Sequence, residues 1–182
     1  SNKISFKKGY KKEYSKIKLK NEKLFQKFGK IGGKVSIARC FTFVGEFLPG
    51  DSQYVVGDFI KSILNNQNIN IKADHQVIRS YMHEEDLVRW LLKIINYSNK
   101  NCPIYNVGSD NAISISKLAN LLSRKYNLNV NSNNIKISKK KFDKYVPSIQ
   151  KARKELNLNN NYTALSAIIK TIDVLKKNEK VN

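Results

Sequence analysis

The chain has 182 residues, 41% of them hydrophobic, and its 34 Lys+Arg against 14 Asp+Glu give a formal charge of +20. This composition suits one soluble globular domain, and no apolar run approaches the length that spans a bilayer, so we expect no membrane partner. Only five of the basic residues are Arg, and the lysines lack interleaved aromatic residues, which disfavours specific nucleic-acid recognition but leaves nonspecific polyanion binding open.

The first predicted element is an amphipathic helix from Lys12 to Phe28. Its apolar positions fall three or four residues apart, and Gly29 follows as a stop signal. The next segment, from Val35 to Gly45, alternates and is rich in β-branched and aromatic residues, which predicts a largely buried strand. Gly45, Pro49 and Gly50 then predict a loop.

The middle of the chain alternates between predicted helices and strands. We expect a helix over Val55–Leu64, a short strand over Ile69–Lys72 and a strand over Ile104–Val107. Between the last two strands, an acidic turn predicts a helix start just after a connection that carries Arg79. Helical spacing predicts that one face of that helix is buried. It consists of Leu87, Trp90, Leu91, Ile94 and Ile95.

Three more helices are predicted towards the C-terminus. Ser114 is expected to cap a helix that ends at Tyr126, and Ser148 a helix that ends near Leu156. The last helix spans Ala164–Leu175, with one apolar stripe. The stretch 127–141 is mostly Asn, Ser and Lys, and we expect it to be a loose connection with a short edge strand at Ile135–Ile137. This alternation predicts an α/β protein with a thin sheet.

Two candidate reactive groups lie in the first helix. Tyr14 and Lys18 form Y-x-x-x-K, which places a phenol and an ammonium on one helix face a single turn apart. A neighbouring cation favours the phenolate, so the pair can exchange a proton with a substrate hydroxyl. In a lysine-rich chain the spacing also arises by chance, which leaves a half-buried Tyr beside a solvated Lys as the alternative.

The two cysteines indicate neither a disulfide framework nor a metal site. Cys40 and Cys102 are isolated from one another and from any second ligand pattern, and Cys40 lies inside the predicted strand. A reducing cytoplasm therefore fits the chain best, and its Lys-rich start lacks the apolar middle of a signal peptide.

Several motifs in one order resemble those of the sugar-nucleotide epimerases and dehydratases, the extended short-chain dehydrogenase/reductases. Glu22 extends the first motif to Y-x-x-x-K-x-x-x-E, and the strand A-R-C-F-T-F-V-G follows at the expected distance. From Arg79 the chain has R-S-Y-M-H-E-E-D-L-V, similar to the R-D/S-F/Y-x-Y/H-V-x-D-L signature. Y-N-V-G-S, S-I-S-K-L-A and P-S-I-Q-K-A-R-K-E-L complete the order, so the resemblance covers residues 14–175.

This resemblance implies a partial Rossmann-like fold with a small α/β substrate-binding subdomain. Residues 1–182 would form a single fragment-like domain. Residues 1–50 would end the Rossmann-like part, and 51–182 would be mainly substrate-binding, with a returning Rossmann element near 77–107.

The resemblance also implies roles for seven residues. Tyr14 would be the catalytic acid/base, and Lys18 would assist it and hold the ribose of NAD. Arg39 and Phe41 would lie beside the cofactor. Thr42 would contact the substrate and Arg79 would grip the diphosphate of a nucleoside-diphosphate sugar, with Asp86 as a helix-start residue. No metal is implied, and a homodimer is implied for the whole enzyme.

Some departures from the family pattern concern the cofactor and the sugar. The sequence contains no G-x-x-G-x-x-G turn to receive the NAD pyrophosphate, so we expect the isolated chain to be inactive. Thr42 replaces a frequent Asn, Glu46 a Pro and Ser148 an Asp, which affects the predicted substrate more than the fold. A non-catalytic nucleotide-sugar-binding module remains an alternative.

Overall fold

The structure, a computed structural model, describes residues 8–47, 54–132 and 142–179. Its helices are α1 (Lys8–Lys30), α2 (Val55–Leu64), α3 (Glu84–Asn96), α4 (Ile115–Tyr126), α5 (Gln150–Leu156) and α6 (Ala164–Glu179). Its strands are β1 (Ile37–Cys40), β2 (Phe43–Val44), β3 (Ile69–Ile71), β4 (Gln76–Arg79), β5 (Met82–His83), β6 (Ile104–Val107), β7 (Ile113–Ser114), β8 (Val130–Ser132) and β9 (Phe142–Tyr145). None of the described helices combines the length and the apolarity needed to cross a bilayer.

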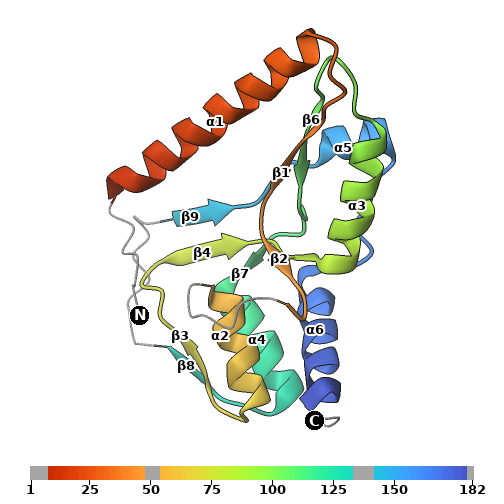
Figure 1. Ribbon diagram of the computed structural model, residues 1–182. Coiled ribbons are helices and arrows are strands. Elements are labelled where there is room, and N and C mark those ends of the chain that lie inside the picture. The colour runs from red at the N-terminus through yellow and green to blue at the C-terminus, as the bar shows by residue number, and fades with distance from the viewer. Residues whose placement is uncertain (1–7, 48–53, 133–141, 180–182) are drawn as a thin grey trace.

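One hydrophobic core is built around the parallel pair β1–β6, against which α3 and α5 pack (Figure 1). Ile37 lies opposite Ile104 and Cys40 opposite Val107 in this pair. We call this the α3–α5 core, and its buried residues are Met82, Trp90, Ile94, Tyr105, Val107, Ile149, Ala152, Leu156 and Leu158. It forms because α3 places Trp90 and Ile94 on one face, one turn apart.

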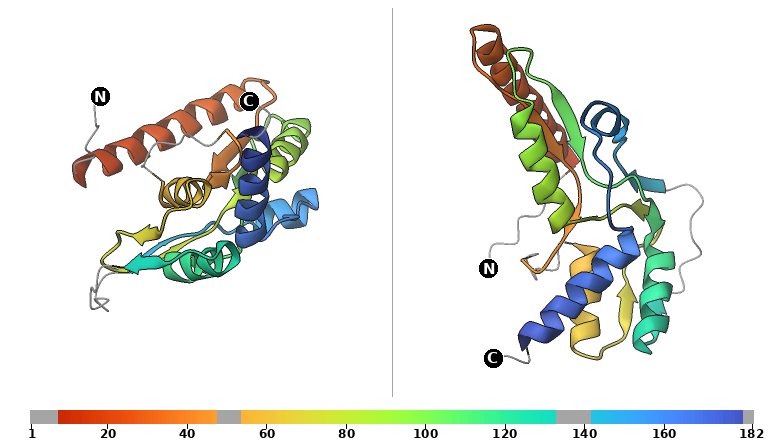
Figure 2. Two further views of the ribbon diagram at one scale, coloured as in Figure 1. Left: turned by 90° about the horizontal axis from the view of Figure 1, so that it is seen from below. Right: turned by 90° about the vertical axis from the view of Figure 1, so that its right-hand side faces the viewer.

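A second, larger core lies among α2, α4 and α6 at the opposite end of the molecule (Figures 1 and 2). Strands β3 and β8 pair in parallel beside it, and β4 pairs with β7 on one side and β9 on the other. We call it the α2–α4–α6 core. Its fully enclosed side chains include Phe59, Ile63, Leu118, Leu122, Ile168 and Ile172.

Helix α1 stands apart from both cores. Figure 1 shows it as a long rod that reaches the β1–β6 pair at its C-terminal end and passes over β9. Its described side chains from Glu13 to Phe28 are exposed except for Glu22 and Gln26, which are half-buried. The helix therefore presents apolar side chains, including Leu24 and Phe25, to its surroundings.

Most of the predicted elements are confirmed. α2, β3, β6 and α4 lie where the periodicity places them, and the Ser114 Oγ accepts a hydrogen bond from the Lys117 N–H, as expected of an N-cap. The apolar stripe of α6 packs on the α2–α4–α6 core. The mixed α/β architecture and the thin sheets are as predicted, because no sheet within the described residues exceeds three strands.

Several predictions are wrong. The strand expected over Val35–Gly45 is broken at Phe41 and Thr42 and is not largely buried, since one edge of β1 has no strand partner among the described residues. In α3, Leu91 and Ile95 are exposed by 37% and 64%, because the helix packs on β2, β5 and β6 through the face that holds Trp90 and Ile94. The predicted edge strand at Ile135–Ile137 and the turn at Pro49 and Gly50 lie outside the described residues.

Two further local predictions are also wrong. Ser148 does not cap α5: the N-cap is Ile149 without a side-chain bond, and the Ser148 carbonyl instead accepts from the Asn106 amide. Arg79 does not lie on a loop. It ends β4, where it pairs with Ile113 of β7 and Tyr145 of β9, two strands whose formation depends on partners far along the chain.

Candidate active site

A cavity of about 860 Å³ lies between α1 and β1. Four predicted site residues line it: Tyr14 and Lys18 from the helix, and Arg39 and Phe41 from the strand and its end. All of β1 lines the cavity, and so does Phe41 just after the carboxyl end of the strand, the end at which open parallel sheets bind ligands. Thr42 and Arg79 are not among its lining residues.

Tyr14 and Lys18 share one face of α1. The Lys18 Nζ lies 5.4 Å from the centroid of the Tyr14 ring, and the Tyr14 side chain is accessible, with the residue 55% exposed. The ammonium thus lies over the face of the ring, within the range of a cation–π contact. Both side chains therefore lie at the wall of the cavity, on the same side of the helix.

The Arg39 guanidinium is occupied by Glu22. Its Nε and Nη2 donate to the two carboxylate oxygens of Glu22 at 2.8 and 2.7 Å, a bidentate ion pair that joins α1 to β1. The hydrogen bond from Arg39 holds the pKa of the Glu22 carboxyl below its usual range. The predicted contact of Arg39 with a cofactor thus involves a side chain already bound within the protein.

Tyr145 is a cavity residue that the sequence did not reveal. It lines the same space as Tyr14, and its ring packs on Phe41 with centroids 4.9 Å apart. Burial and the neighbouring Tyr14 raise the pKa of Tyr145, whereas Arg79 lowers it. Tyr145 shares the cavity with Tyr14 and lies opposite Arg79 in the β4–β9 pair, so it is the register of β9 on β4 that brings it there.

Arg79 is held at the end of β4 by Asp143 of β9, two residues before its cross-strand partner Tyr145. Its Nη2 donates to the Asp143 Oδ2 at 2.6 Å, and its Nη1 donates to the carbonyls of Ile78 and Asp143. The side chain is only 24% exposed. A bound anion would have to share this guanidinium with the Asp143 carboxylate.

Thr42 follows the end of β1 and is half-buried. Its carbonyl accepts a hydrogen bond from the Met82 N–H, which ties the β1–β2 connection to β5. The structure brings Tyr14, Lys18, Arg39 and Phe41 together, with Thr42 next in the chain.

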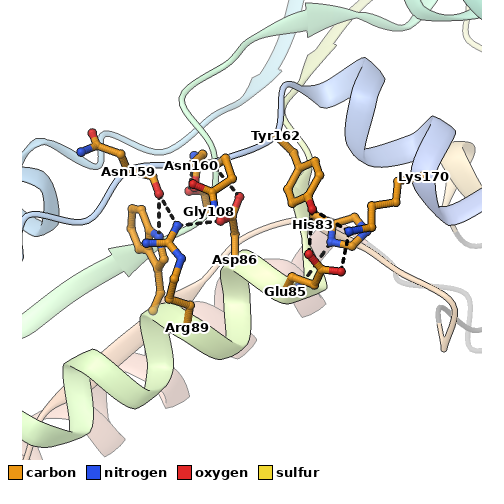
Figure 3. Close-up of polar contacts among 11 residues, drawn as sticks. His83, Glu85, Asp86, Arg89, Gly108, Asn159, Asn160, Tyr162 and Lys170 are labelled. Carbon is orange, nitrogen blue, oxygen red and sulfur yellow. Dashed lines mark hydrogen bonds and ion pairs between the residues drawn. The ribbon is translucent and has the colours of Figure 1, made fainter.

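The start of α3, which follows Arg79, is fixed by a buried carboxylate (Figure 3). Asp86 is fully buried and accepts from the Arg89 Nη2 at 2.6 Å and from the Asn161 N–H at 2.9 Å. Arg89 also donates to the carbonyl of Asn159. Asp86 is thus the helix-start residue that the motif implied, and in addition it anchors the loop between α5 and α6.

A second polar cluster joins the same end of α3 to α6 (Figure 3). The Lys170 Nζ and the Tyr162 hydroxyl both donate to the Glu85 carboxylate, at 2.6 and 2.7 Å. His83 lies beside Tyr162 with ring centroids 4.5 Å apart, and its Nδ1 accepts from the Glu85 N–H as the N-cap of α3. Burial lowers the pKa of His83.

The model of the NAD dependent epimerase/dehydratase family matches residues 3–108. The chain belongs to this family. The membership agrees with the predicted resemblance and with the mixed α/β fold. No curated protein sequence matches the chain significantly.

Solved structures of similar fold include relatives of this family. Pal from Bacillus thuringiensis is 26% identical, with a TM-score of 0.64 over 79% of this chain and 46% of that one. UDP-glucose 4-epimerase from Thermotoga maritima, solved with UDP-glucose, is 19% identical, with a TM-score of 0.65 over 80% and 47%. UDP-glucuronic acid 4-epimerase from Bacillus cereus, in complex with UDP-glucuronic acid and NAD, is 19% identical, with a TM-score of 0.65 over 79% and 46%.

The two epimerases share the fold of this chain at low sequence identity, so they carry no residue roles across. The chain spans about half the length of each of these solved structures. The family therefore accounts for its architecture, while its substrate and its own chemistry depend on the cavity described above.

Proposed function

We propose that this chain is the C-terminal, substrate-binding portion of an NAD-dependent nucleotide-sugar epimerase or 4,6-dehydratase. The observation that carries the proposal is the cavity in which Tyr14 and Lys18, one helical turn apart, face the carboxyl end of β1. The solved relatives that hold UDP-sugars support a nucleoside-diphosphate sugar as the ligand.

The chemistry follows from the two side chains. Tyr14 would take a proton from a sugar hydroxyl through its phenol oxygen and later return it. Lys18, with its Nζ 5.4 Å from the ring, would stabilise the phenolate between these steps and hold the ribose of the cofactor. When bound, NAD would supply a hydride acceptor and donor.

The residues of this chain fit only one end of NAD. Tyr14, Lys18 and the β1 end, with Arg39 and Phe41, would flank the nicotinamide and its ribose. Nothing in the sequence offers the glycine-rich turn whose backbone amides receive a pyrophosphate. We therefore expect weak NAD binding and no turnover by the isolated chain.

Arg79 would grip the diphosphate of the nucleotide sugar. A planar guanidinium matches phosphate oxygens in a bidentate manner, and its hydrogen bond to Asp143 fixes the orientation of the fork before a ligand arrives. Thr42 would contact the sugar from the loop that follows β1, where its carbonyl is already tied to β5.

The experiment is calorimetric titration of the chain with UDP-glucose, UDP and NAD. We expect saturable binding of the two uridine nucleotides and much weaker binding of NAD. Arg79→Ala should lower the affinity for UDP-glucose about 10- to 100-fold, because a charged hydrogen-bond donor is lost. Arg124→Ala, at an exposed arginine in the last turn of α4, is the matched control. Absence of binding by every sugar nucleotide at millimolar concentration contradicts the proposal.

A non-catalytic nucleotide-sugar-binding module is the closest alternative, and it keeps the role of Arg79 while Tyr14 does nothing. The position of Arg79, which is not among the residues that line the cavity of Tyr14, favours it. Joining the chain to a glycine-rich NAD-binding half separates the two functions. Turnover that disappears in Tyr14→Phe supports the enzyme, whereas folded, ligand-binding but inactive protein supports the module.

A nonspecific polyanion binder is the second alternative. Lys23, Lys27 and Lys30 of α1 and Lys100 line a recess of about 500 Å³ without an acidic residue among its lining. Such a site would bind any DNA or RNA with an affinity that falls steeply as salt increases. A flat salt response excludes this function.

A further inference from the structure

The orientation of α1 depends on few contacts. Its described side chains before Gly29 are exposed apart from Glu22 and Gln26, whereas Gly29 itself is buried. At Gly29 the helix lies against the carbonyl of Lys100, so close that an added Cβ would come within 2.6 Å of that oxygen. Gly29 therefore fixes the C-terminal end of α1 against the loop before β6.

The second fixed point is the ion pair between Glu22 and Arg39. Two guanidinium nitrogens of Arg39, Nε and Nη2, donate hydrogen bonds to the Glu22 carboxylate at 2.8 and 2.7 Å. The Arg39 side chain is 44% exposed and the Glu22 side chain 16%. A bidentate pair fixes direction as well as distance, because two parallel hydrogen bonds resist rotation of either group. The pair thus ties the middle of α1 to the strand that forms the opposite wall of the cavity.

The length of α1 shows how strongly the position of Tyr14 depends on the ion pair between Glu22 and Arg39. Tyr14 precedes Gly29 by 15 residues, which is about 22 Å along the axis, and precedes Glu22 by about 12 Å. A tilt of about 5° around Gly29 alone displaces Tyr14 by about 2 Å. Misplacement of a reacting group by about 1 Å can cost on the order of 100-fold in rate.

We propose that Glu22 and Arg39 are positioning residues that hold Tyr14 and Lys18 at their working distance from the end of β1. The pair acts through the helix, because the Arg39 guanidinium and the Glu22 carboxylate are bound to each other. This role rests on the proposed function of Tyr14, but the restraint on α1 is a geometric property that holds with or without catalysis.

A partly exposed ion pair of this kind contributes little to global stability. Glu22→Gln should therefore shift the melting temperature by less than about 4 °C, while the position of Tyr14 becomes variable. A residue with a merely structural role would show the opposite, a loss of stability with an unchanged position.

The test is a pulsed electron-electron distance measurement on the full chain. Spin labels are attached through Lys16→Cys on α1 and Lys154→Cys on α5, both exposed, in a background with Cys40→Ser and Cys102→Ala. We expect a narrow distance distribution with Glu22 and Arg39 in place. Glu22→Gln should broaden it about twofold or shift its centre by about 2 Å or more.

Three further variants complete the test. Arg39→Lys keeps the positive charge but loses the bidentate guanidinium, so the distribution of spin-label distances should broaden as in Glu22→Gln. The charge swap of Glu22→Arg with Arg39→Glu should restore the narrow distribution. Glu13→Gln, which removes a carboxylate from the same exposed helix, should leave it unchanged.

An unchanged width in folded Glu22→Gln and Arg39→Lys, or a swap that stays as broad as the single variants, overturns the proposal. Either result is independent of nucleotide-sugar titration. Failure of the restraint can therefore be told apart from failure of the proposed function.

Discussion

The α2–α4–α6 core and the α1–β1 region differ in how completely they bury their apolar side chains. In the core, Phe59, Leu118 and Ile168 are fully buried. On α1, Tyr14, Leu24 and Phe25 are exposed by 55%, 56% and 55%, although the helix has the same apolar periodicity. Periodicity thus shows which face of a helix is apolar, and not whether this chain covers that face.

The α2–α4–α6 core buries its apolar side chains within the chain, whereas α1 presents an apolar surface to its surroundings. Several large exposed apolar side chains on one element mark a surface that binds something. The region with this surface also holds Tyr14, Lys18 and the edge of β1 that has no strand partner in the part of the chain that the structure describes. The predicted catalytic residues Tyr14 and Lys18 thus lie in the region that buries its apolar side chains least. Arg79, the predicted phosphate-binding residue, lies on β4, beside the α2–α4–α6 core.

Truncating a phenylalanine in each region should give the largest contrast. Phe59→Ala removes a fully buried ring and should lower the free energy of unfolding by about 3–5 kcal/mol, through lost transfer free energy and a cavity. Phe25→Ala, at a ring exposed by 55%, should change it by less than about 0.5 kcal/mol. Urea denaturation measures both, and equal effects would mean that α1 is packed after all.

The buried carboxylate at the start of α3 should give the next largest effect. Asp86→Ala leaves the Asn161 N–H and the Arg89 guanidinium without their acceptor, and we expect a loss of about 2–3 kcal/mol. Asp110→Ala removes a comparable carboxylate from Arg153, with both side chains more than 40% exposed, and should cost less than about 1 kcal/mol. Similar losses in the two variants would contradict a specific anchoring role for Asp86.

The N-cap of α3 should give a smaller, pH-dependent effect. Burial lowers the pKa of His83 in the folded protein, so the unfolded chain binds the proton first as the pH falls. Stability is then fully present above about pH 6.5 and is lost as the pH falls below this value. The protonated ring also cannot accept from the Glu85 N–H, a cap worth about 1 kcal/mol.

Replacing this histidine by a residue that caps without titrating isolates its contribution. His83→Asn should flatten the dependence of stability on pH between 7 and 5, as measured by urea denaturation at each pH. His75→Asn changes the other histidine of the chain and should keep the wild-type slope. If the two variants behave alike, His83 does not cause the slope.

The sequence predicted elements whose signals are local. α2 and β6 follow from periodicity and flanking turns, and Ser114 from cap chemistry. β9 could not be predicted, because its pairing depends on β4, far along the chain. For the same reason Tyr145 escaped notice as a cavity residue, and the contact between Arg79 and Asp143 was invisible.

In the candidate site, too, local features were predicted from the sequence and long-range contacts were not. The motif placed Tyr14 and Lys18 on one helix face, since four residues make about one turn. That Glu22 would occupy Arg39 follows only from the packing of α1 beside β1. Exposure is the property that sequence patterns predicted least well here, as Leu91 and Ile95 show on α3.

The central claim is that Tyr14 and Arg79 serve one nucleotide-sugar site, with Tyr145 between them. Fluorine NMR of the chain labelled with 3-fluorotyrosine, with signals assigned by Tyr→Phe variants, tests it during titration with UDP-glucose. We predict that the Tyr14 and Tyr145 signals shift with one dissociation constant and that the signal of Tyr97, the residue after α3, stays unchanged. Arg79→Ala should raise that dissociation constant about 10- to 100-fold. Shifts of equal size at Tyr97, or a Tyr14 signal that stays fixed while UDP-glucose saturates the chain, would contradict the account.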